Sequence, residues 1–180
     1  MIMPEADVRE PLLERLYARG LQKQLGQNLF PPDLWHQSLS GRFFSDSPAA
    51  IKRLLAVGDQ SSAPPFNLTL DRIAGGEGPP FHWAFRAARR PLQLSRLIES
   101  IRKALLAQGG HDDAQPSAHI TISYRAPGPL PPTPIPAVHW TVWEFLLVRG
   151  GGTPYRYEVL GRWPLRPDAV SPQRSLFEEI

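Results

Sequence analysis

The sequence contains no cysteine, and this absence excludes several kinds of site. Disulfide scaffolds, thiol nucleophiles and cysteine-ligated zinc all require that residue. A chain without cysteine suits a reducing compartment, so we expect a cytoplasmic protein. The N-terminal sequence MIMPEADVRE also lacks the basic region and apolar core of an export signal.

Long hydrophobic runs are absent as well. No stretch approaches the roughly 18 apolar residues of a spanning helix, so we expect no membrane association. The 180 residues are 42% hydrophobic and 21% charged, which is typical of a soluble globular protein with one domain. We expect a monomer whose single domain covers residues 1–166, with a C-terminal tail over residues 167–180.

The excess of positive charge is small. A net charge of +3 permits an anionic partner without demanding one. The segment between Ala84 and Leu106 contains six cationic residues and a single acid, Glu99. The cationic residues are Arg86, Arg89, Arg90, Arg96, Arg102 and Lys103. A solvated helix face explains this cluster equally well from charge alone.

Two segments in the first third of the chain have helical periodicity. Residues 4–26 carry apolar side chains at three-to-four spacing, and Pro11 either kinks this helix or opens it. A shorter helix is expected to follow the capping pair Ser47-Pro48 and to end at Gly58. Its inward-facing residues are Ile51, Leu54 and Leu55.

The clearest helical pattern lies in the middle of the chain. Pro91 opens this helix, and Gly109-Gly110 closes it. One apolar stripe runs along it, formed by Leu94, Leu97, Ile98, Ile101 and Leu105.

The remaining segments alternate with a period of two, which is typical of strands. Residues 66–71 and 81–85 are expected to form neighbouring strands across a glycine-rich turn. Residues 138–148 and 155–163 are expected to form a hairpin. The proline-rich stretch 126–136 cannot be a central strand. Helices mixed with hairpins favour an α+β fold with mainly antiparallel sheets.

Two of the five histidines occur in similar settings. They lie in Trp35-His36-Gln37-Ser38-Leu39-Ser40 and Ala118-His119-Ile120-Thr121-Ile122-Ser123, which share the pattern His-x-Ser/Thr-x. In a strand, alternation places His36, Ser38 and Ser40 on one face and Trp35, Gln37 and Leu39 on the other. The same rule groups His119, Thr121 and Ser123 and buries Ile120, Ile122 and Tyr124 behind them.

Two such segments facing one cleft would suit a phosphate. In-line displacement at phosphorus needs a base on the entering oxygen and an acid on the leaving oxygen, and histidine titrates closest to neutral pH. The two hydroxyls can donate hydrogen bonds to the non-bridging oxygens. This scheme requires no metal or other cofactor. A single copy of the pattern is more often structural, and it is the second copy that strengthens the functional hypothesis.

The chain resembles the bacterial 2'-5' RNA ligase family, whose members are RNA 2',3'-cyclic phosphodiesterases of the two-histidine phosphoesterase superfamily. The paired motifs carry the resemblance, together with the segments 66–73, 138–148 and 155–165. It extends from about Pro4 to Leu165. The resemblance implies a two-lobed, pseudo-twofold α+β fold with mainly antiparallel sheets around a central cleft and helices on the outside.

The resemblance also implies an activity. Family members open a terminal 2',3'-cyclic phosphate to a 2'-phosphate, and several join tRNA half-molecules through a 2'-5' linkage without ATP. By matching position, His36 and His119 are the acid/base pair, and Ser38 and Thr121 bind the phosphate oxygens. The first histidine acts as acid toward the leaving 3'-oxygen and the second as base toward water, and by microscopic reversibility these roles exchange in the reverse reaction.

Three features depart from the family pattern. Only Met1-Ile2-Met3 precedes Pro4 where a hydrophobic strand is usual, so that strand is short or the start is truncated. Ser38 stands where threonine is commoner. Many members carry arginine five residues past the second histidine, where this chain has Tyr124 followed by Arg125. A phosphate contact from Arg125 or Tyr124 would need a β-bulge or a different geometry.

Other residues carry weaker hypotheses. His111-Asp112-Asp113 resembles a partial metal site, and a solvated turn is the better explanation. His82 and His139 sit beside tryptophans and either line the cleft or occupy half-buried sheet positions. Phe43, Phe44 and Trp140 are candidates for stacking on a base. Arg86, Arg89 and Arg90 are our favoured site for further contacts with RNA phosphates, with a solubilising turn as the alternative.

Two other functions compete with RNA cyclic phosphodiester hydrolysis. One is a non-catalytic module that binds phosphorylated RNA ends. The other is a hydrolase of a non-RNA cyclic phosphate, including a cyclic nucleotide or a nucleotide-sugar derivative. The intact histidine and hydroxyl in both motifs favour catalysis.

Overall fold

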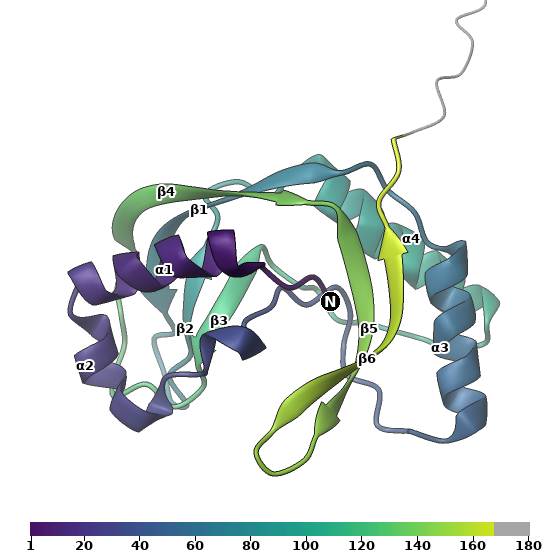
Figure 1. Ribbon diagram of the computed structural model, residues 1–180, viewed down its shortest axis with the longest axis horizontal. Helices are drawn as coiled ribbons and strands as arrows, with labels where there is room; N and C mark the ends of the chain where they lie inside the picture. The colour runs from purple at the N-terminus through teal and green to yellow at the C-terminus, as the bar shows by residue number, and fades with distance from the viewer. Residues whose placement is uncertain (168–180) are drawn as a thin grey trace, which may run out of the picture.

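Within residues 1–167, which the computed structural model describes, six strands form two antiparallel sheets. The larger sheet has the order β3-β2-β1-β4, and the smaller one pairs β5 with β6 (Figure 1). The strands are β1 (Phe66–Gly75), β2 (Trp83–Arg86), β3 (His119–Ser123), β4 (Thr133–Val142), β5 (Glu144–Gly151) and β6 (Arg156–Pro164). The α+β class expected from the sequence is confirmed.

Four α-helices within that range divide between the two sheets. They are α1 (Ala6–Ala18), α2 (Leu21–Leu25), α3 (Pro48–Gln60) and α4 (Leu92–Ala107), and short 3-10 turns follow α2 at Gly26–Asn28 and Pro32–Leu34. Helices α1 and α2 lie with the larger sheet, whereas α3 and α4 lie with the smaller one (Figure 1). The chain therefore has two lobes, each a sheet with its own pair of helices.

The expected helix over residues 4–26 is broken. Helix α1 ends at Ala18, Gly20 has a φ of 66°, and α2 begins at Leu21. Glycine adopts this left-handed conformation without the steric cost that a Cβ imposes, so it allows the turn between the helices. Pro11 lies inside α1, so it does not open the helix.

Helix α3 begins as predicted and ends later than predicted. The Ser47 side chain accepts a hydrogen bond from the Ala50 amide at 3.2 Å, which confirms the cap. The prediction that Gly58 ends the helix is wrong, because the helix continues to Gln60. Gly58 serves packing instead, since an added Cβ would lie 2.1 Å from the Trp163 ring.

Helix α4 matches its prediction closely. The five residues of the expected apolar stripe are all buried, and Pro91 is the N-cap residue before the helix. Beside α4, α3 packs against β5 and β6, so the two helices cover the smaller sheet (Figure 1).

The strands pair as predicted, but their boundaries differ, most of all between β4 and β5. Strands β1 and β2 are neighbours as expected, and β5 and β6 form the expected hairpin. The stretch 138–148, expected as one strand, is interrupted at Trp143, where the chain passes from the larger sheet to the smaller. Pro134 and Pro136 lie in β4, at the edge of its sheet, where proline is tolerated.

The expected tail over residues 167–180 lies, after Pro167, outside the described residues. None of the helices between residues 1 and 167 combines the length and the apolar character that crossing a bilayer requires.

Candidate active site

The first histidine motif alternates as predicted without belonging to a regular strand. Trp35 and Gln37 are 0% exposed, whereas His36 and Ser38 are partly exposed. The expected strand is replaced by a single bridge, in which Gln37 exchanges two backbone hydrogen bonds with Ile2 at 2.9 and 3.0 Å. The extended backbone alone is enough to separate the two faces.

The segment Met1–Ile2 connects this motif to the smaller sheet. The Leu146 amide of β5 donates to the Met1 carbonyl at 2.8 Å, while Ile2 bridges to Gln37 on its other side. Ile2 is 1% exposed. This short segment thus takes the place of the N-terminal strand that the family pattern leads one to expect.

The second histidine motif forms β3, with a bulge that changes its faces. Ser123 pairs with Trp83 and Thr121 with Ala84, so Ile122 is an extra residue in β3. Ser123 is therefore 0% exposed and does not share the His119 face, contrary to the prediction. A bulge reverses the alternation beyond it, so Tyr124 is half-buried and borders the cleft instead of lying behind the strand.

Both histidines hold their rings through the same backbone contact. His36 Nδ1 lies 2.9 Å from the Leu34 carbonyl, and His119 Nδ1 lies 2.9 Å from the Ser117 carbonyl. A carbonyl oxygen only accepts, so Nδ1 carries the proton in each ring. Nε2 is then the atom left for proton exchange with a ligand.

Burial lowers the pKa of both histidines. For His36, desolvation is the main cause, the hydrogen bond with the Leu34 carbonyl opposes it, and the positive charges of the N-terminus, Arg42 and His119 lower the pKa further. For His119, desolvation again leads, and the Arg86 charge adds to it. Both rings are therefore neutral at pH 7, and a bound phosphate anion would favour protonation of one of them.

A cleft of about 550 Å³ opens beside the first motif. His36, Ser38 and Arg42 line it together with Tyr124 and Tyr157. The Tyr157 ring meets His36 edge-on at 5.5 Å between centroids, and burial raises the pKa of Tyr157 to about 12. This phenol thus remains a hydrogen-bond donor throughout the physiological range.

His119 and Thr121 do not line this cleft themselves; they lie on β3 beside it. Hydrogen bonds join β3 and the residues before it to the first motif and to Gly41, which follows that motif. The Gln37 side chain accepts from the His119 amide at 2.6 Å. Asp112 accepts from the Gly41 amide at 3.1 Å.

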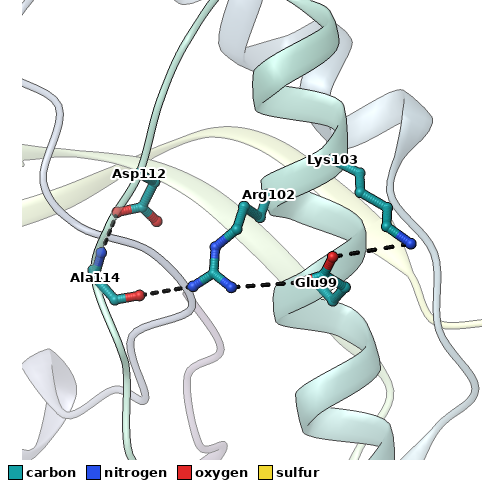
Figure 2. Close-up of polar contacts among 5 residues, drawn as sticks. All are labelled: Glu99, Arg102, Lys103, Asp112 and Ala114. Carbon is teal, nitrogen blue, oxygen red and sulfur yellow. Dashed lines mark hydrogen bonds and ion pairs between the residues drawn. The ribbon is translucent and has the colours of Figure 1, made fainter.

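Asp112 is part of a network anchored on α4 (Figure 2). It accepts from the Ala114 amide at 3.0 Å, and Arg102 donates to the Ala114 carbonyl at 3.0 Å. Arg102 and Lys103 also lie 3.4 and 3.9 Å from Glu99. Asp112 therefore tethers a half-buried loop, and the expectation of a solvated turn is wrong for this residue. It holds for His111 and Asp113, which are exposed and pair with each other. No cluster of metal-ligating side chains occurs in the described part of the chain.

The arginines proposed for phosphate contacts occupy different positions. Arg86 is the β2 partner of His119 in the sheet register, and its charge acts on that ring. Arg89 and Arg90 are exposed in the connection to α4, and Arg125 is exposed outside the cleft. Of these four, only Arg86 lies beside a motif histidine.

The residues expected to stack on a base also differ in position and exposure. Phe43 and Phe44 line the cleft and are 41% and 93% exposed. Trp140 is 4% exposed in the core, so the expectation that it could stack on a base is wrong. His139 is exposed on β4 and bonds Thr69 Oγ1 at 3.1 Å.

His82, the remaining histidine, is exposed outside the cleft, where it contacts the Tyr124 ring at 4.9 Å between centroids. Arg42 and Tyr157 also line the cleft, and no sequence motif pointed to either residue. Arg42 follows the first motif closely, which is a weak signal, whereas nothing local marks a tyrosine on the far hairpin.

The fold has several known counterparts among solved structures. LigT from E. coli in its apo form superposes with a TM-score of 0.71 at 24% identity, over 92% of this chain and 95% of LigT. The complex of LigT with 3'-AMP gives 0.68 at 24% identity, with 92% and 95% coverage. A protein from Thermus thermophilus gives 0.68 at 25% identity, with 93% and 97% coverage.

Comparison of sequence alone is less informative. No protein-family model matches the chain, and no curated protein matches it. The structural agreement over almost the whole length nevertheless shows that this chain has the fold of LigT, which is the fold expected from the paired motifs.

Proposed function

We propose that this protein is a metal-independent RNA 2',3'-cyclic phosphodiesterase. The observation that carries the proposal is the matched tethering of His36 and His119, each through Nδ1 to the carbonyl two residues earlier. That arrangement fixes one tautomer in both rings and leaves two Nε2 atoms free for acid/base work. Structures of LigT with 3'-AMP, ATP and phosphate support a nucleotide-like ligand.

The reaction requires a base on one side of the phosphorus, which removes a proton from the attacking water, and an acid on the other side, which gives a proton to the leaving oxygen. His119 Nε2 takes a proton from water as its oxygen bonds to phosphorus, and the bond from phosphorus to the 3'-oxygen breaks. His36 Nε2 delivers a proton to that leaving oxygen, so the product is a 2'-phosphate with a free 3'-hydroxyl. Ser38 and Thr121 donate to the non-bridging oxygens. The same displacement with an RNA 5'-hydroxyl in place of water as the nucleophile gives a 2'-5' linkage.

The substrate brings part of the charge that this chemistry needs. Both histidines are neutral near pH 7 because burial lowers the pKa of each. A cyclic phosphodiester carries one negative charge, and its approach favours the protonated form of one imidazole. After substrate binding, the protonated imidazole serves as the acid and the neutral imidazole as the base.

The test is turnover of a 2',3'-cyclic nucleotide and of an RNA with a 2',3'-cyclic end, both in EDTA. We expect a 2'-phosphate product and a loss of about 10²- to 10⁴-fold in kcat for His36→Ala and His119→Ala. His139→Ala is the matched control, because this histidine is exposed outside the cleft and should leave the rate unchanged. Full activity in His36→Ala would overturn the scheme, and RNA binding without product would favour the non-catalytic alternative.

A further inference from the structure

Gln37 is a buried polar side chain whose amide is fully engaged. It is 0% exposed, on the face of the first motif opposite His36. Its Oε1 accepts from the His119 amide at 2.6 Å, and its Nε2 donates to the carbonyls of Ser38 and Ser117 at 2.6 and 2.9 Å. An amide at this depth is stable only when it is hydrogen-bonded, so its orientation is set by these partners.

Gln37 binds the same backbone carbonyl that accepts a hydrogen bond from the second histidine. The Ser117 carbonyl accepts from Gln37 Nε2 and also from His119 Nδ1, at 2.9 Å in each case. The same Gln37 side chain accepts the backbone amide of His119. Gln37 therefore fixes the ring acceptor and the backbone of His119 together, from a position adjacent to His36 in the chain.

We propose that Gln37 is a positioning residue that sets the place and tautomer of His119 relative to His36. Its importance for turnover rests on the proposed function, whereas its effect on the ring can be measured without substrate. Within residues 1–167 no regular sheet pairing joins the two motifs, because the first bridges to Ile2 and β3 pairs with β2. The Gln37 side chain supplies the direct hydrogen-bonded connection between them.

The first test is Gln37→Met, which keeps the length of the side chain and removes all three hydrogen bonds. We expect kcat on the cyclic phosphate to fall by about 10- to 100-fold, because a displacement of about 1 Å is enough for such a loss. KM should change less than about threefold. Ser61→Ala is the control: Ser61, the C-cap residue of α3, is also buried, and its hydroxyl donates to the Val57 carbonyl of the same helix at 2.7 Å and not to either motif.

A second readout is independent of activity. Long-range proton–nitrogen NMR of the wild-type histidines should show His119 with its proton on Nδ1, and Gln37→Met should lose that single tautomer. A folded Gln37→Met variant with wild-type kcat and an unchanged His119 tautomer would overturn the proposal. A wild-type protein without turnover would contradict the proposed function, and the NMR comparison would still decide the role of Gln37.

Gln37→Glu keeps the test available if the methionine variant does not fold. The introduced carboxyl retains an acceptor for the His119 amide, but when ionised it offers no donor to Ser117. Protonation at low pH restores one donor. We therefore expect the activity of this variant, relative to the wild type, to rise as the pH is lowered from 8 to 5. A constant ratio across that range would contradict the proposal.

Discussion

His36 and His119 come from opposite halves of the chain and present the same atom for chemistry. In each, Nδ1 donates to the carbonyl two residues earlier, Leu34 or Ser117, at 2.9 Å. In the proposed reaction and its reverse the acid and base roles exchange, and two groups so alike suit either role. What distinguishes them is their surroundings, because Arg42 acts on the first ring and Arg86 on the second.

The lowered pKa values of the two histidines predict the pH dependence of catalysis. The profile of kcat/KM reports the free enzyme, which must hold one ring neutral and the other protonated. Because burial places the pKa of both rings below 6.5, the bell should have its maximum on the acid side of pH 6.5. Initial rates at subsaturating cyclic nucleotide between pH 4.5 and 8.5 measure this, and a maximum above pH 7.5 would contradict it.

The same shifts have a consequence for stability. Between pH 6.5 and the lower folded-state pKa values, the unfolded chain binds protons that the folded chain does not. The free energy of unfolding should therefore fall as the pH is lowered below 6.5. Urea denaturation of the wild type and of a His36→Gln variant measures the effect. The variant should lose less stability on acidification, and equal losses would contradict the assignment.

Much of this architecture could be predicted from the sequence, because periodic patterns report which face of a segment is buried. The apolar stripe of α4 and the alternation around His36 are examples. The end of α3 could not be predicted, since glycine is usually a stop signal and only the contact with the distant Trp163 explains why Gly58 stands inside the helix. The face of Tyr124 depends on the bulge at Ile122, which sequence alternation does not reveal.

Gly58 gives a prediction in which two local effects oppose each other. In an exposed helix, alanine is better than glycine by about 1 kcal/mol. Here an added Cβ would lie 2.1 Å from the Trp163 ring, so steric conflict should outweigh propensity and Gly58→Ala should destabilise by about 1 to 3 kcal/mol. Gly78→Ala is the control, because its added Cβ meets nothing within 4 Å among the described residues. Thermal unfolding compares the two, and a stabilised Gly58→Ala would refute the packing explanation.

Thr121 is expected to act through its hydroxyl and not through its shape. Thr121→Val preserves the branched side chain on β3 and removes the donor to a non-bridging phosphate oxygen. We expect kcat to fall by about 10²-fold with stability changed little, because such donors act mainly on the charge of the transition state. Thr121→Ser should retain most of the activity. Equal activity of the valine and serine variants would remove Thr121 from the proposed site.

Asp112 should matter for stability, whereas its neighbour Asp113 should not. Asp112→Ala leaves the half-buried amides of Gly41 and Ala114 without their acceptor, at a cost of about 1 to 3 kcal/mol. The Asp113 side chain is 86% exposed, so its pair with His111 contributes little. Chemical denaturation of both alanine variants checks this. Equal stability of the two variants would contradict a tethering role for Asp112.

Arg42 and Arg125 provide a direct comparison of two arginines that each follow a histidine motif. Arg42 lines the cleft and its charge lowers the pKa of His36, whereas Arg125 is exposed outside the cleft. Arg42→Met should therefore raise the pKa of His36 and also raise KM for an anionic substrate, since both effects come from the loss of one positive charge. Arg125→Met should leave both quantities unchanged. NMR titration of His36 and steady-state kinetics measure them separately. If Arg125→Met weakened binding and Arg42→Met did not, the phosphate would lie beyond the second motif instead of in the cleft beside His36.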